Sequence, residues 1–281
     1  MSPIRAAAAV ACLMLLNTGC MREGMSTEQV LQALDETQQS ARGERLTSEP
    51  IDISTEFTIG DAVEAAAQQL ADFWVSQQPC TTVTLEAGVV TVDYGGLDDP
   101  CEFEGKTFGG IARVSVDDTQ AGQVQVSHAW EALTDGETRV DGGAVVTWVE
   151  AGAFARQVET DHQFTDVATG DQVDVLGSHE WTFLNDTAGL DDGLMLTGER
   201  TWSSTTGEWH IDMVDLEIRL QDPVAQAGTI ELTNPDGKVL TLLHERVDES
   251  TIRITLTGAR RDWVFDINQL GIPSQVDDTD A

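Results

Sequence analysis

Three histidines, each followed two positions later by an aromatic residue, are the side chains best suited to bind a metal ion. They are His128 before Trp130, His162 before Phe164, and His179 before Trp181. Alternate residues of a β-strand point to the same side, so each imidazole would share a face with its aromatic neighbour. If Gly170-Asp171 formed a two-residue turn, His162 would lie opposite His179, with Cβ atoms about 5 Å apart.

Two interpretations of these histidines stay open. Two close imidazoles with further His, Asp or Glu ligands would suit zinc or copper, which makes His162, His179 and His128 candidates for a divalent metal. Alternatively, they are half-buried residues of an amphipathic sheet. The second interpretation is favoured, so we predict no cofactor. Carboxylates at 98, 99, 102 and 104 offer oxygens for Ca²⁺, but without the regular spacing of a calcium loop.

Catalytic signatures are absent from the sequence. It has no G-x-S-x-G, H-E-x-x-H, phosphate-binding loop or dinucleotide-binding glycine pattern. Acidic pairs such as Asp117-Asp118 and Asp191-Asp192 fall in expected turns, where aspartate usually caps its own backbone. We therefore predict that the protein is not an enzyme.

The elements that would position these side chains are mainly strands. Ser26-Thr27-Glu28-Gln29 has capping-box form and predicts a short helix near 27–42, followed by a linker at 43–56. An apolar stripe over 59–77, made by Ile59, Val63, Ala66, Leu70 and Phe73, predicts a second helix that covers one face of the sheet.

From residue 81 the hydrophobic period becomes two, and turn signals separate the runs, which predicts hairpins joined in an antiparallel meander. The first hairpin turns at Ala87-Gly88, and a change of phase predicts a β-bulge near Met213. A single open sheet of this many strands cannot stay flat. We therefore expect a half-open or closed barrel, or alternatively a two-sheet sandwich. Segments 127–148 and 161–181 form a weak repeat that suggests one hairpin used twice.

The N-terminus has the pattern of an export signal. Arg5 precedes a run of about ten apolar residues, too short to span a membrane but typical of a signal peptide. The run ends at Asn17-Thr18-Gly19-Cys20, which resembles a bacterial lipobox, with Asn17 in place of the usual Leu. We expect residues 1–19 to be removed and Cys20 to carry acyl chains that hold the protein on a membrane. The alternative is an ordinary cleaved signal.

Two further cysteines, Cys80 and Cys101, would remain in an oxidising compartment, which predicts a disulfide. The bridge closes a loop of about 20 residues, which is worth roughly 3 kcal/mol in the chain-entropy model.

The chain is strongly acidic, with 49 Asp and Glu against 15 Lys and Arg. Such a surface would repel phosphates, so nucleic acid is excluded as a partner. Adaptation to salt, binding of divalent cations and simple solubility would each explain the charge, which is spread through loops and outward strand positions.

The stretch VTVDYGGLDDPCEFEGKTFGG at 90–110 resembles a motif of uncharacterised bacterial envelope lipoproteins, roughly ITIDFG, Cys, DGR and GKI. Here Glu104-Gly105-Lys106 replaces Asp-Gly-Arg, and Val140-Asp141-Gly142 matches a downstream V-x-G. The resemblance implies an envelope β-protein and supplies no catalytic residue. A lipid-anchored curled sheet with a covering helix also looks like the half-barrels of Lol-type lipid carriers.

Together these features predict a signal peptide (1–19), a lipid-anchored tether with a short helix (20–56), a helix and antiparallel β domain (57–270) and a disordered acidic tail (271–281). We expect a non-enzymatic structural or interaction module, lipid-anchored in the bacterial cell envelope. Met21 after Cys20, with no Asp there, is compatible with sorting to the outer membrane. The expected partners are the membrane, through the acyl chains, and an envelope protein or a hydrophobic ligand. The alternative is a carrier of lipid or another hydrophobic ligand, with Trp130, Trp148, Trp181 and Phe183 lining its cavity.

Overall fold

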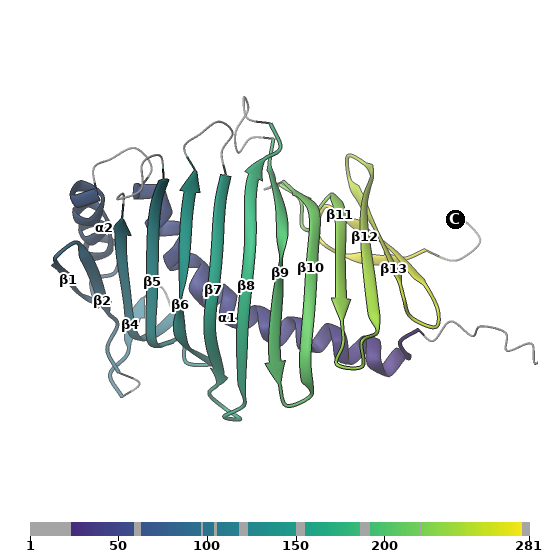
Figure 1. Ribbon diagram of the computed structural model, residues 1–281, viewed down its shortest axis with the longest axis horizontal. Helices are drawn as coiled ribbons and strands as arrows, with labels where there is room; N and C mark the ends of the chain where they lie inside the picture. Colours follow the sequence, from purple (N-terminus) through teal and green to yellow (C-terminus); the bar gives the residue numbers. More distant parts are fainter. Residues whose placement is uncertain are drawn as a thin grey trace, which may run out of the picture.

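One antiparallel sheet, in which almost every strand pairs with its neighbours in the chain, makes up most of the molecule (Figure 1). The computed structural model describes residues 24–58, 63–96, 98–103, 106–117, 123–149, 155–185, 192–219 and 221–276 of the 281. Within these ranges the strand order runs from β1 to β15 without a crossover, and only β3 lies off this path, paired with β4. The predicted meander is confirmed.

The bounds of the elements follow the chain order. The helices are α1 (Thr27–Thr58) and α2 (Val63–Gln77). The strands of the first half are β1 (Thr82–Glu86), β2 (Val89–Asp93), β3 (Cys101–Phe103), β4 (Lys106–Asp117), β5 (Gln123–Thr134), β6 (Thr138–Val149), β7 (Ala155–Asp166) and β8 (Gln172–Phe183). Those of the second half are β9 (Leu194–Ser204), β10 (Gly207–Ile218), β11 (Ala227–Thr233), β12 (Val239–Asp248), β13 (Thr251–Thr257), β14 (Trp263–Asn268) and β15 (Pro273–Gln275).

The sheet stays open. Its described strands form one path whose ends, β1 and β15, do not pair with each other, so neither the closed barrel nor the two-sheet sandwich is present. The first hairpin turns at Ala87 and Gly88, both with positive φ, as a type I′ turn requires. The predicted bulge is confirmed, because the register of β10 shifts between Met213 and Leu216 against β9 and between Val214 and Glu217 against β11.

Helix α1 is the largest departure from the sequence prediction. Its start is as expected: the Gln29 backbone N–H donates to Ser26 Oγ at 3.2 Å, and the Ser26 N–H donates to Gln29 Oε1 at 3.1 Å. However, α1 continues to Thr58, so the predicted end near 42 and the predicted linker at 43–56 are wrong.

The reason lies in the buried stripe of α1, which is small and polar in its middle part. Its members are Val30, Ala33, Glu36, Ser40, Gly43, Thr47 and Ile51. The spacing is helical, but the residue types carry no apolar period, so the usual signal for an amphipathic helix is missing.

Helix α1 crosses one face of the sheet obliquely, passing behind the strands in Figure 1. At its beginning, the Met25 N–H donates to the carbonyl of Gly258 and the Arg260 N–H donates to the carbonyl of Met25, which joins it to the β13–β14 connection. Further along it packs on β4, β5 and β6. We call this face of the sheet the covered face and the opposite one the open face.

Helix α2 covers the beginning of the sheet. It packs on β1, β2 and β4 through Ala66, Ala67, Leu70 and the fully buried Trp74. The predicted stripe is thus partly confirmed, although Phe73 is only half-buried and Ile59 lies outside the described residues. Neither described helix is long and apolar enough to cross a membrane.

Candidate functional site

The predicted disulfide between Cys80 and Cys101 is present, with the two Cα atoms 5.2 Å apart. It joins the segment after α2 to the start of β3. Nearby Gly95 has φ of 84°, and a Cβ there would lie 2.3 Å from the carbonyl oxygen of Asp99. The stretch at 90–110 is therefore a tightly folded corner. Among the described residues, its carboxylates do not gather at metal-ligand distance.

The three predicted metal ligands lie on the covered face but do not meet. His162 is opposite Val175, and His179 is opposite Val158, so the predicted cross-strand pair is wrong. The loop between β7 and β8 is longer than two residues because Asp166 organises it: its Oδ1 accepts the N–H groups of Ala168 and Thr169. Each residue added to the loop shifts the register of His162 against β8.

Aromatic rings surround these imidazoles. His128 stacks on Trp130 with ring centroids 6.0 Å apart, and Trp130 meets the ring of His162 edge-on at 6.3 Å. Gly142 lies between Trp130 and His162 on β6. A Cβ at Gly142 would lie 2.5 Å from the Cα of His162, so only glycine permits this contact.

Burial keeps the histidines of the covered face neutral. It lowers the pKa of His128 to about 4 and that of His162 to about 4, with Arg200 adding a smaller effect at His162. The pKa of His179 is also lowered to about 4, first by burial and then by the charges of Arg156 and Arg200. Among the described residues, none of the three belongs to a group with metal-ligand geometry.

Charged side chains of α1 and the sheet pair beneath the helix. Glu44 forms an ion pair with Arg200, whose side chain is only 9% exposed. Burial raises the pKa of Glu44, and the charge and hydrogen bond of Arg200 oppose this rise. Glu36 accepts hydrogen bonds from Trp202 Nε1 at 3.4 Å and Ser204 Oγ at 3.2 Å, and also from the Thr206 hydroxyl. These contacts fix α1 against β9.

The four aromatic residues predicted to line a cavity also lie on the covered face. Trp130 and Trp148 are buried, and Trp181 and Phe183 are half-buried. The guanidinium of Arg156 lies 5.9 Å from the ring centre of Trp148 and 5.6 Å from that of Trp181. Trp148 and Trp181 are thus packed against a charged side chain, and none of the four aromatic residues lines the hollow described next.

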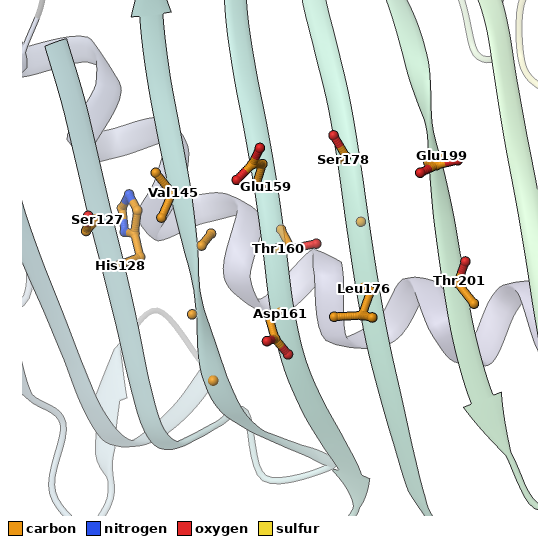
Figure 2. A pocket seen from close by; sticks show the side chains of 14 residues that line it. Ser127, His128, Val145, Glu159, Thr160, Asp161, Leu176, Ser178, Glu199 and Thr201 are labelled. Atoms are coloured by element: carbon orange, nitrogen blue, oxygen red, sulfur yellow. The ribbon is translucent and has the colours of Figure 1, made fainter.

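A hollow of about 750 Å³ spans β5 to β9, and its charged side chains lie on the open face. Figure 2 shows Glu159, Asp161, Leu176 and Glu199 on the side of the sheet away from α1. Alternation along β7 explains this placement, because Glu159 and Asp161 are exposed whereas Val158, Thr160 and His162 are buried. The residues that line the hollow are Ser127, His128, Gly142, Gly143, Ala144, Val145, Glu159, Thr160, Asp161, Leu176, Gly177, Ser178, Glu199 and Thr201.

Small residues give the hollow its depth, and carboxylates give it its charge. Gly143 has no side chain to fill the space, and a Cβ there would lie 2.4 Å from the carbonyl oxygen of His128. Glu159, Asp161 and Glu199 are exposed, and no Lys or Arg is among the lining residues. Within the described part of the chain, none of these three carboxylates forms an ion pair, so the potential in the hollow is negative.

The sequence prediction missed this hollow because its residues come from five strands whose register was unknown. The alternating pattern of β7 was a usable signal, since it placed two carboxylates on the face opposite the histidine. Nothing in the sequence linked them to Glu199.

Comparison with known proteins adds no relative: no family model, curated protein or solved structure matches this chain. The resemblances to envelope lipoproteins and to Lol-type half-barrels therefore remain predictions.

Burial of His162 predicts a dependence of stability on pH. Its pKa is about 4 in the folded protein and 6.5 ordinarily, so between these values the unfolded chain binds a proton that the folded chain does not. Stability should therefore fall as the pH is lowered through this window. In His162→Gln the pH slope of the unfolding free energy, measured by urea denaturation from about pH 7 to about pH 5, should decrease by up to about one proton. An unchanged slope in His162→Gln, with the exposed Gln172→Asn as a control, would contradict this burial.

Proposed function

We propose that the protein is a non-enzymatic, lipid-anchored protein of the bacterial cell envelope that binds a positively charged polypeptide segment in the acidic hollow. The observation that carries this proposal is the group of unpaired carboxylates at Glu159, Asp161 and Glu199, set in a depression on the open face. Hollows of this volume are typical of ligand-binding sites.

The shape of the hollow favours an extended ligand. It reaches over five strands, β5 to β9. Because neighbouring strands are about 4.8 Å apart, this corresponds to roughly 19 Å, or about six residues of extended chain. Carboxylates lie in the middle of this length, on β7, and at one end, on β9, with Leu176 of β8 between them. This arrangement suits basic side chains that alternate with an apolar contact.

The alternative function, a carrier of a hydrophobic ligand, has less support. Such a carrier needs an open apolar groove, but α1 lies across the face that holds the aromatic residues. The ion pair of Glu44 with Arg200 and the hydrogen bonds of Glu36 hold the helix there.

Anchoring is supported by the lipobox-like sequence, and Cys20 itself lies outside the described residues. Expressed in a bacterium that processes lipoproteins, the wild-type protein should incorporate labelled palmitate and fractionate with membranes. Cys20→Ser should lose the label and appear in the soluble fraction, whereas the matched control Cys12→Ser should behave as wild type because that cysteine leaves with the signal. Membrane attachment of Cys20→Ser would argue for an ordinary cleaved signal.

Binding to the hollow can be tested with hexalysine by isothermal titration calorimetry. The double variant Glu159→Gln/Asp161→Asn should bind about threefold to tenfold more weakly, since each exposed ion pair contributes up to about 1 kcal/mol. Salt should weaken binding to the wild type. The double variant Glu208→Gln/Glu245→Gln removes the same charge from exposed strand positions outside the hollow. An equal loss in this control would show general attraction to an acidic surface and would contradict the proposal.

A further inference from the structure

At the β9 edge of the hollow, three potential metal ligands come together on the open face. Glu199 lies on β9, and His210 and Asp212 lie on β10; one ligand atom from each falls within 4.8 Å of the other two. Asp212 is directly opposite Glu199, and the Nε2 atom of His210 lies 3.0 Å from a carboxylate oxygen of Asp212. Two neighbouring strands thus present one imidazole and two carboxylates to the same point.

A fourth side chain orients the imidazole. Thr201 is opposite His210, and its hydroxyl lies 3.0 Å from Nδ1. With a metal ion on Nε2, Nδ1 would carry the proton and would donate it to the Thr201 hydroxyl. Histidine ligands in metal sites usually have such a partner, which fixes the tautomer and the ring.

The two strands that carry these ligands, β9 and β10, are held in place by buried residues on the covered face. Trp202 and Trp209 are fully buried and stack with ring centroids 6.2 Å apart and nearly parallel planes. Trp209 and Ile211, both buried, flank His210 on β10. Because the ligands alternate with buried residues on paired strands, their spacing is set before any ion binds.

We propose that Glu199, His210 and Asp212 bind one divalent transition-metal ion, with Zn²⁺ the best fit. One imidazole nitrogen and two carboxylate oxygens suit Zn²⁺, whereas Ca²⁺ and Mg²⁺ prefer sets made only of oxygen atoms. Three protein ligands leave a coordination position for water or a bound group. The site uses none of the three histidines that the sequence suggested. It shares Glu199 with the acidic hollow, but binding of the ion does not require that a basic segment binds there.

The test is a titration of the EDTA-treated, folded protein with zinc chloride in the presence of excess Mg²⁺, which occupies non-specific carboxylates. One equivalent of Zn²⁺ should bind to the wild type. Both His210→Gln and Asp212→Asn should weaken binding by at least about tenfold, and Thr201→Val should weaken it by about tenfold through loss of the orienting contact. Glu208→Gln, an exposed carboxylate on the same strand, should leave the affinity unchanged.

A second readout reports the imidazole directly. Co²⁺ added to the wild type should give the visible absorption of a low-symmetry nitrogen and oxygen site, and His210→Gln should abolish it. Unchanged Zn²⁺ affinity in His210→Gln, or an equal loss in Glu208→Gln, would overturn the proposal. Because His210 and Asp212 are 33% and 41% exposed, their variants should fold, and circular dichroism checks this.

Discussion

The contact between α1 and the covered face is the constraint on which the rest of the structure depends. An open antiparallel sheet with one apolar face must cover that face, and among the described elements α1 and α2 do so. Helix α1 makes this contact with a stripe of small and polar residues rather than with leucines. It lies close to β7 at Gly43, where a Cβ would come within 3.1 Å of His162 Nε2 and 3.2 Å of Phe164 Cβ.

This contact divides the sheet into two faces with different surroundings. On the covered face, tryptophans pack with Arg156 and Arg200, and burial keeps His128 and His162 neutral. On the opposite face, the carboxylates of β7 and β9 remain accessible around the hollow. The histidines that the sequence singled out are therefore buried among aromatic rings, and the exposed side chains of the open face come from positions that read as ordinary strand surface.

The sequence predicted the features that depend on local pattern. Period-two alternation predicted the meander, the turn signal Ala87-Gly88 between two alternating runs predicted the first hairpin, and the phase change predicted the bulge near Met213. The disulfide followed from counting cysteines. The length of α1 could not be predicted in this way. The middle of its buried side consists of Glu36, Ser40, Gly43 and Thr47, which give no apolar period in the sequence.

Features that depend on register were harder to predict. Asp166 builds a longer loop than Gly170-Asp171 suggested, and this separated His162 from His179. By contrast, the tight β9–β10 hairpin pairs Ser204 with Gly207 and so brings Glu199 opposite Asp212. The approach of Glu199 to Asp212 on the open face thus depends on where this turn falls.

Amide hydrogen exchange of the purified chain, followed by mass spectrometry, tests the central claim that α1 covers the sheet along its length. Peptides from residues 30–47 should exchange as slowly as those from β6 and β7, because their amides are in a helix packed on the core. Exchange of residues 43–47 at the rate of an unstructured chain, with the strands still protected, would show a linker there and would contradict the account.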